Sequence, residues 1–263
     1  MNSQLTPTRL VSAGVVLLLT KHVITVYFKM APAPRRRITE VDSIPDSLND
    51  SATRKTMINP HGHTALVDSR FMDVDVPPAA QGLKDEALLA AFVRGFFGGR
   101  VFAPERALLR LARPDLVKFT AIPSTSSSLP PPIWDIERFE GDVLPPLYTI
   151  LFGAFQVAHV ELAEPSSSVA AKKKKTEASS SYVDIVFGSD TAQFAGVHRF
   201  TILRDGSKRP DSIRVYISHM SCNPTVDKPL KPDILFSLHK AYAMWLFREA
   251  VAEVMRRIRA EKP

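Results

Sequence analysis

The sequence has very little cysteine: Cys222 is the only one among 263 residues. A single thiol excludes a disulfide framework and any metal site built from several cysteines, and it suits a reducing compartment. The chain also lacks the phosphate-binding glycine loop, the dinucleotide-binding fingerprint, the nucleophile elbow of α/β hydrolases and the metalloprotease helix motif. We therefore expect neither a cofactor nor a metal.

A basic surface for nucleic acid is lacking as well, although the net charge is +7. Residues 1–60 carry 8 basic and 4 acidic side chains, and residues 166–182 carry 4 and 1. These two segments contribute +4 and +3, so the remaining 186 residues sum to zero. Because a nucleic-acid-binding domain carries its basic excess on folded surface, we exclude nucleic acid as a partner.

Residues 1–30 form an apolar N-terminal segment. Its apolar run from Leu10 to Met30 has the length of a membrane span, although Lys21 and His22 interrupt it. The arginines at 35–37 follow this run, and by the positive-inside bias they would keep the rest of the protein in the cytosol. A membrane anchor, a cleaved targeting segment and a tail lying on a membrane or on the protein itself remain open. We expect the protein at the cytoplasmic face of a membrane or in the cytoplasm, rather than secreted.

The rest of the chain divides into a linker and one domain. Residues 31–60 are rich in Pro, Ser, Asn, Asp and Arg, which predicts a flexible tether. Residues 61–263 form the folded domain, with a polar insertion at about 165–181 that contains four consecutive lysines. We expect this insertion to be a solvated loop at the tip of a hairpin.

Periodicity predicts the order of elements in that domain. A strand within His63–Val76 precedes two short helices at Leu83–Phe97 and Pro104–Leu111. Strand-like segments follow at Leu116–Ile122, Ile133–Phe139, Tyr148–Leu162 (long enough to bend or split), Tyr182–Phe187, Gly196–Leu203 and Ile213–Met220. Pro232–Arg259 is one long helix with a broad apolar stripe. This order predicts an α+β helix-grip fold, in which a curved antiparallel sheet wraps around the C-terminal helix and leaves an apolar cavity.

Alternation along the last three strands separates two faces of the sheet. One face is apolar apart from two histidines, and it contains Val183, Ile185, Phe187, His198, Phe200, Ile202, Val215, Ile217 and His219. We expect this face to line the cavity and bind the ligand, together with Tyr242 and Trp245 of the long helix. The other face carries Tyr182, Asp184, Arg199, Thr201, Arg214 and Tyr216, which predicts a charge ladder on the solvent side.

His198 and His219 are the candidate catalytic residues, because imidazole exchanges protons near neutral pH. The structural alternative is that each histidine is neutral, buried and hydrogen-bonded to a backbone carbonyl or to Tyr242.

Several segments of the domain resemble a family of unknown function in the START-like (SRPBCC) superfamily. The likeness lies in QVAHVE at Gln156–Glu161, VDIVFGS at Val183–Ser189, GVHRFTI at Gly196–Ile202 and VYISHMSCNP at Val215–Pro224, followed by the long helix. It implies a helix-grip fold and a hydrophobic small-molecule ligand. START-like domains include enzymes and carriers, so two functions are expected. One is a cofactor-free cyclase, isomerase or dehydratase of polyketide- or terpenoid-like metabolites, and the other is a non-catalytic carrier of a lipid or another apolar ligand.

Overall fold

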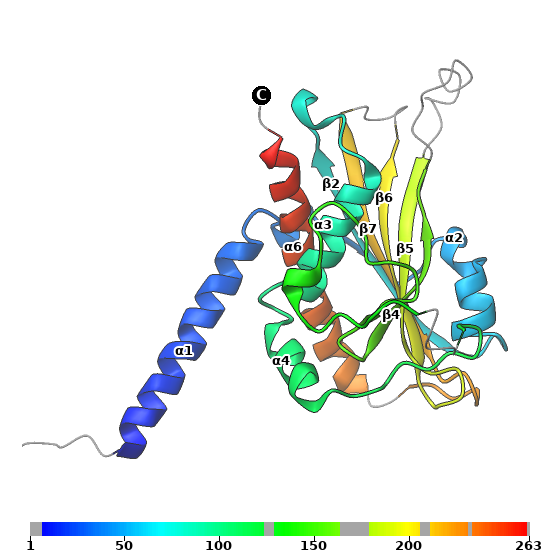
Figure 1. Ribbon diagram of the computed structural model, residues 1–263, viewed down its shortest axis with the longest axis horizontal. Helices are drawn as coiled ribbons and strands as arrows, with labels where there is room; N and C mark the ends of the chain where they lie inside the picture. The colour runs from blue at the N-terminus through cyan, green and yellow to red at the C-terminus, as the bar shows by residue number, and fades with distance from the viewer. Residues whose placement is uncertain (1–6, 124–128, 164–178, 206–210, 231–232, 262–263) are drawn as a thin grey trace, which may run out of the picture.

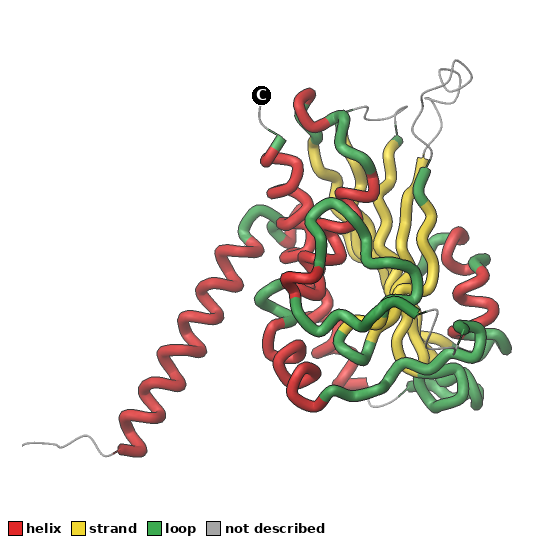
Figure 2. Tube along the Cα trace, in the orientation of Figure 1, coloured by secondary structure: helices red, strands yellow, loops and turns green. Residues whose placement is uncertain are grey.

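The structure is a computed structural model that describes residues 7–123, 129–163, 179–205, 211–230 and 233–261, without the side chains of 7–15 and 233–238. A seven-stranded antiparallel sheet has the order β1-β2-β7-β6-β5-β4-β3. Its strands are β1 (Thr39–Val41), β2 (Ala65–Asp75), β3 (Ile150–Leu151), β4 (Phe155–Glu161), β5 (Ser179–Gly188), β6 (Ala195–Arg204) and β7 (Ser212–Cys222). The helices are α1 (Pro7–Met30), α2 (Asp46–Asn49), α3 (Asp85–Gly98), α4 (Ala103–Ala112) and α6 (Asp233–Ala260), and Figures 1 and 2 show their arrangement around the sheet.

The predicted α+β helix-grip order is confirmed. From β2 onward the chain runs strand, two helices, five strands and one long helix. The long segment at 148–162 splits into β3 and β4, as its length allowed. The curved sheet packs against the C-terminal helix, with α3 and α4 following β2 directly (Figure 1).

Two of the predicted strands are wrong. Leu116–Ile122 and Ile133–Phe139 each touch the sheet through one isolated bridge, at Lys118 and at Ile133. Both segments then turn away from the sheet edge. The first does so because its apolar side chains pack over the outer face of the sheet, where they join a second core. The second closes into a short 3₁₀ turn.

Helix α3 fills much of the space beneath the concave face. It packs against β5 and β6 on one side and against α6 on the other. The ring of Phe92 lies 5.1 Å from that of Phe200 in the sheet and 5.9 Å from that of Phe247 in α6, both edge to face. The close approach of the two helices requires Gly95, since a Cβ there would lie 2.7 Å from the Cα of Ala250. The centre of the helix grip is therefore a packed aromatic core.

The prediction that residues 31–60 form a flexible tether is wrong. Strand β1 pairs with β2, and α2 is followed by a single π-helical turn at Thr53–Ile58. Leu48 and Ile58 are fully buried. They cover apolar residues that alternate to the outer face of the sheet, among them Val186 and Val197. This segment looks polar because it supplies only a few apolar side chains, but those few complete a core whose other half lies in the strands.

The predicted charge ladder lies on the outer face, but it is not on solvent. Asp184 is 0% exposed and Arg199 is 1% exposed, because residues 44–58 cover them. The Arg199 guanidinium donates to both carboxylate oxygens of Asp184, at 2.6 and 2.7 Å, and lies 3.8 Å from the centre of the Tyr182 ring. The pairing of Arg214 with Asp73 does remain at the surface. The alternation of the strands correctly placed these residues on the outer face, but it could not show that another segment covers that face.

Helix α1 contains the apolar run of residues 10–30 and projects away from the body of the protein (Figure 1). Val26 and Met30 are buried, while the residues from Val16 to Leu19 are 60% to 70% exposed. Within the described residues, no single helix passes a length and hydropathy test for a membrane span; α3 with α4 passes it only as a pair bent by 75°. Most of the predicted insertion, residues 164–178, lies outside the described residues, and β5 begins at 179.

Candidate functional site

The two candidate histidines meet on the concave face. His198 of β6 and His219 of β7 are direct partners in the sheet register, and each is only 8% exposed. Their Nδ1 atoms are 3.3 Å apart, which is a hydrogen bond between the two rings. The same register places Ile185 opposite His198 and Phe200 opposite Ile217, as the alternation predicted.

Ser221 extends this pair into a chain of hydrogen bonds. Its Oγ lies 3.1 Å from Nε2 of His219, so both nitrogens of that ring are engaged. Among the described residues, Nε2 of His198 has no hydrogen-bond partner. Two proton arrangements satisfy the chain: either Ser221 donates to His219, which donates to His198, or every donor is reversed. In the first arrangement Nε2 of His198 is a donor, and in the second it is an acceptor.

Burial keeps both rings neutral at neutral pH. Desolvation, reinforced by the neighbouring histidines and by Arg70, lowers the pKa of His198 well below its ordinary value. Desolvation, with smaller contributions from His239 and Arg70, lowers the pKa of His219 to about 3. A neutral imidazole has one donor and one acceptor nitrogen, and the hydrogen-bond chain requires that state.

Aromatic rings form the walls around the pair. The Phe187 ring stacks parallel to that of His219, with 5.8 Å between centroids, and lies 4.9 Å from the ring of His198. The ring of Phe96, from α3, lies 5.5 Å from that of His198. Phe187 reaches this position across Gly196, where a Cβ would lie 2.2 Å from the Phe187 ring. A site of this kind suits an apolar ligand with one hydrogen-bonding atom.

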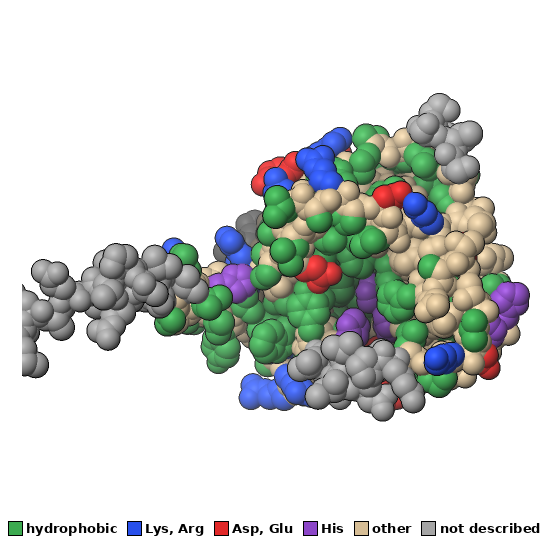
Figure 3. All heavy atoms as spheres, turned by 90° about the horizontal axis from the view of Figure 1, so that it is seen from below, with side chains coloured by type: hydrophobic (Ala, Val, Ile, Leu, Met, Phe, Trp, Pro, Cys, Tyr) green, Lys and Arg blue, Asp and Glu red, His purple; other side chains and the backbone are tan. Residues whose placement is uncertain are grey.

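His239 of α6 lies at the rim of the site. Its ring centroid is 5.4 Å from that of His219, and its side chain is exposed. Figure 3 shows a recess on this side of the molecule, in which histidine side chains appear between apolar ones. Desolvation lowers the pKa of His239; Arg70 lowers it further, and Asp68 opposes the shift. The recess therefore connects the neutral histidine pair with the surface.

An ion pair on β2 borders the same end of the face. Asp68 is the register partner of His219, and its Oδ2 lies 2.5 Å from Nη1 of Arg70. Arg70 also donates to the backbone carbonyl of Lys240 in α6, at 3.4 Å. The sequence analysis did not identify Asp68, Arg70, Ser221 or His239. The alternation of β2 could have revealed the first two, because charged residues there occupy the same face as Met72 and Val74.

The other predicted ligand-binding residues lie deeper or elsewhere. Six of them are buried in the main core: Val183, Ile185, Phe200, Ile202, Val215 and Ile217. Tyr242 is half-buried and donates from its hydroxyl to Glu105 at 3.0 Å, so it does not hold either histidine. The prediction that Trp245 faces the cavity is wrong, since it is 52% exposed. Each residue turns the helix by about 100°, so the side chains of Trp245 and of the buried Phe247 lie on nearly opposite sides of α6.

The described residues offer this site neither a cluster of metal-binding side chains nor a thiol nucleophile. Across the described parts of the chain, no group of three or more His, Cys, Asp or Glu side chains is arranged to hold a metal ion. Cys222 is buried, its Sγ donates to the carbonyl of Ile58 at 3.2 Å, and burial raises its pKa to about 11. The thiol is therefore protonated at neutral pH and bound within the outer core.

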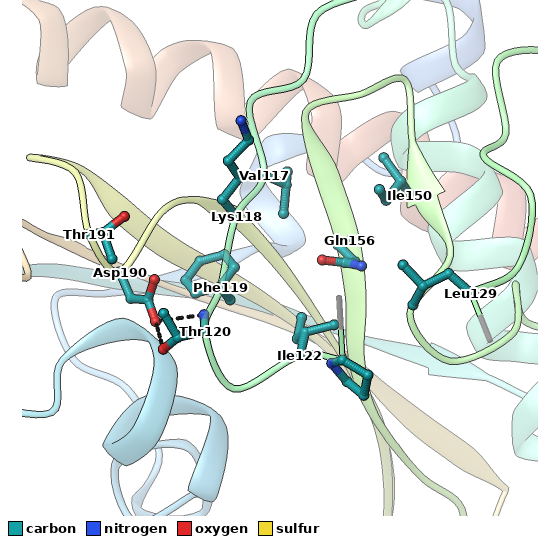
Figure 4. A pocket seen from close by; sticks show the side chains of 11 residues that line it. Val117, Lys118, Phe119, Thr120, Ile122, Leu129, Ile150, Gln156, Asp190 and Thr191 are labelled. Carbon is teal, nitrogen blue, oxygen red and sulfur yellow. Dashed lines mark hydrogen bonds between the residues drawn. The ribbon is translucent and has the colours of Figure 1, made fainter. Parts of the chain in front are cut away.

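A separate cavity of about 380 Å³ opens between the segment at 117–123, β4 and the turn after β5 (Figure 4). Its polar groups hold the surrounding loops together. Thr120 donates its amide and its hydroxyl to Asp190, at 2.9 and 2.5 Å, and Gln156 donates to the carbonyl of Tyr148 at 2.9 Å. None of the predicted site residues lines this cavity. The histidine recess is the better candidate site, because it contains both predicted catalytic residues, joined by a hydrogen bond.

Comparison with known proteins gives no further guidance. No protein-family model, curated protein or solved structure matches the chain. The function must therefore be argued from the geometry of the recess.

Proposed function

We propose that the protein is a START-like domain that binds a hydrophobic small molecule at the histidine recess and acts on it as a cofactor-free enzyme. The reaction class is that of an isomerase, cyclase or dehydratase of polyketide- or terpenoid-like metabolites. The observation that carries this proposal is the chain from Ser221 through His219 to His198, which leaves Nε2 of His198 as an unused ring nitrogen beside aromatic walls.

His198 can serve both halves of a proton transfer. As an acceptor, its Nε2 takes a proton from a carbon next to a carbonyl group, and the C–H electron pair moves toward the carbonyl oxygen. The imidazolium then returns the proton to another atom of the same substrate, so atoms and electrons balance without an oxidant. Burial makes this imidazolium a strong acid, which favours the return step.

The surroundings support an apolar substrate held in one orientation. Phe187 and Phe96 have ring centroids 4.9 and 5.5 Å from that of His198, and they offer ring faces and edges but no hydrogen bonds. A ligand oxygen is then oriented by the histidine, and the hydrocarbon part by the rings. Such positioning is the main contribution that a cofactor-free site can make to cyclisation or isomerisation.

The non-catalytic carrier remains the second candidate, and one observation favours it. A pKa of about 3 makes His219 a weak base, and the pKa of His198 is lowered as well. In a carrier, His198 would donate one hydrogen bond to the ligand and transfer no proton. The recess and its aromatic walls would serve that role equally well.

The two functions separate in one experiment. Native mass spectrometry of the full chain, purified from its own cells, identifies the small molecule that co-purifies, and this compound is then incubated with wild type and His198→Gln. For an enzyme, we expect the variant to fold and bind, while turnover falls by roughly two to four orders of magnitude. For a carrier, no turnover exists and the affinity changes by at most about 1–2 kcal/mol.

His159→Gln is the matched control, because His159 lies in the same sheet but its side chain is 46% exposed and contacts Tyr182 and Glu161. It should change neither turnover nor affinity. If no apolar compound co-purifies and His198→Gln behaves like His159→Gln throughout, the histidine recess is not the functional site.

A further inference from the structure

A second, more polar pocket lies where α1 meets α3 and α6. Its volume is about 220 Å³, and four of its lining residues are basic: Lys29, Arg94, Arg100 and Arg256. The glycines at 95, 98 and 99 form part of its wall, so peptide groups are accessible beside the basic side chains. Two carboxylates, Glu249 and Glu253, complete the polar lining.

Both carboxylates of this pocket already have partners. Glu249 accepts the backbone N–H groups of Arg100 and Val101, each at 2.7 Å, and Glu253 pairs with Arg256. By contrast, the side chains of Lys29, Arg94 and Arg100 make no hydrogen bond or ion pair among the described residues. Four basic and two acidic side chains give the described lining a surplus of positive charge.

The neighbouring helix α1 has the opposite character. From Val16 to Leu19, four successive apolar residues are each at least 60% exposed, and Tyr27 and Phe28 are exposed near its C-terminal end. Four residues cover slightly more than one helical turn, so this turn, just before Lys21 and His22, is apolar on every side. A helix of this composition is buried in a protein core or in a membrane. Among its described side chains, the two buried ones, Val26 and Met30, lie near the C-terminal end, where the helix contacts the body.

Basic groups gather where the apolar helix ends. Lys29 belongs both to α1 and to the pocket, and residues 35–37 are three successive arginines. Arg248 of α6 donates to the carbonyl of Ala33 at 2.8 Å, which fixes the chain at this point. Phosphate groups bind arginine through paired charge-assisted hydrogen bonds, and basic segments beside a membrane are attracted to anionic lipids.

We propose that a bilayer containing anionic phospholipid takes up the apolar surface of α1, and that the basic pocket binds a phosphate-bearing headgroup at the same place. The basic pocket and the apolar surface of α1 meet at Lys29. A phospholipid needs this arrangement, because its phosphate group lies next to its hydrocarbon chains. This membrane site is independent of the histidine recess and of the function proposed for it.

Flotation with lipid vesicles tests this proposal on the full chain. The vesicles contain either phosphatidylcholine alone or phosphatidylcholine mixed with phosphatidic acid. We expect wild type to prefer the anionic vesicles, and Arg94→Gln/Arg100→Gln to bind them roughly thirty-fold more weakly, which corresponds to about 1 kcal/mol for each basic side chain. Binding to the neutral vesicles should be the same for both proteins, because α1 is unchanged.

The control variant Arg110→Gln/Lys118→Gln removes two positive charges from exposed sites away from the pocket. It should bind both kinds of vesicle like wild type, and circular dichroism should show that all variants are folded. Equal loss in both double variants would assign the effect to overall charge and overturn the pocket.

Two further results would overturn the lipid as the occupant. Binding of inorganic phosphate in calorimetry, lost in Arg94→Gln/Arg100→Gln, with no preference among vesicles, would make this a site for free phosphate. Absence of vesicle binding together with self-association that is lost on deleting residues 1–30 would assign α1 to a contact between copies of the chain.

Discussion

Two neighbouring residues of β6 face opposite sides of the sheet and end in two kinds of buried polar site. His198 joins a neutral pair on the concave face, at a recess with one ring nitrogen unused. Arg199 joins an ion pair on the convex face, which residues 44–58 cover completely. Burying a charge is costly unless it is paired and hydrogen-bonded, whereas a neutral imidazole can be buried at lower cost.

The two sites differ in how much bonding capacity they leave unused. Both oxygens of Asp184 accept hydrogen bonds from Arg199, and Thr53 donates a further one at 2.7 Å. Arg199 donates in addition to the carbonyl of Ser47 at 2.7 Å. The polar groups of this convex site are buried and already hydrogen-bonded to one another, so the site is not suited to bind a ligand. Among the described residues, the histidine site keeps a ring nitrogen without a hydrogen-bond partner and opens toward the surface (Figure 3). For this reason we propose it, and not the convex site, as the functional one.

The largest effect is expected from breaking the convex ion pair. Arg199→Gln leaves the Asp184 carboxylate buried without its counter-charge, and it should lower the free energy of unfolding by about 3–5 kcal/mol. Urea denaturation measures this directly. The control is Arg214→Gln, which breaks a partly exposed pair with Asp73 on the same sheet and should cost less than about 1 kcal/mol. Similar costs for the two variants would mean that Arg199 is not sealed from solvent.

The second largest loss of stability is expected from the segment at 44–58 that covers the Asp184–Arg199 pair. Leu48 is fully buried in the outer core, so Leu48→Ala should cost about 3 kcal/mol in urea denaturation. Leu111→Ala is the control, since Leu111 is 85% exposed and its truncation should change stability by less than about 0.5 kcal/mol. If both variants are equally stable, residues 44–58 are a tether after all, and the contrast between the two faces fails.

The concave half of this comparison could largely be predicted from the sequence. Period-two alternation placed His198, His219 and Phe187 on one face, because every residue of a strand must point to one side or the other. Trp245 was misplaced because the apolar stripe of a long helix is broad, and a bulky aromatic residue at its margin can point outward. Asp68 and Arg70 were missed because a charged side chain is costly to bury on the concave face. The ion pair between them reduces that cost.

The convex half could not be predicted in the same way. The strands show that Asp184 and Arg199 face outward together, but the cover comes from residues more than one hundred positions earlier in the chain. Leu48 and Ile58 lie in a segment with few apolar residues, so neither helical nor strand periodicity marks them. Opposite charges directly across two strands, at Asp184 and Arg199, were the one available signal of a buried pair.

The third prediction uses pH to distinguish the neutral pair from the charged one. His198 and His219 have lowered pKa values in the folded protein, near Arg70, Asp68 and His239, and ordinary values when unfolded. As pH falls below 6.5, the unfolded chain binds more protons, so stability decreases by about 1.4 kcal/mol per pH unit for each histidine. For His219 this continues until its folded pKa of about 3.

Urea denaturation between pH 6 and pH 4.5 measures that slope. His198→Gln/His219→Gln should remove about 2.8 kcal/mol per pH unit from it, whatever the variant does to stability at pH 7. The control is Ser218→Ala on the same strand as His219, which removes no titratable group and should leave the slope as in wild type. An unchanged slope in the double variant would show that the pair is accessible to protons in the folded state, and the neutral chain of hydrogen bonds would be wrong.

The smallest effect concerns Ser221, at the inner end of the chain. Ser221→Ala removes one hydrogen bond to His219, so it should cost about 1 kcal/mol in stability. In the control, Ser218 lies on the same strand but faces the convex side, where its buried hydroxyl has no hydrogen-bond partner in the described structure. Ser218→Ala should therefore be neutral or slightly stabilising. If Ser218→Ala costs as much as Ser221→Ala, the hydrogen bond from Ser221 contributes nothing to the chain. If Ser221→Ala also shifts the ¹⁵N resonances of the His198 ring, the chain transmits the change of partner from one histidine to the other, as the two proton arrangements require.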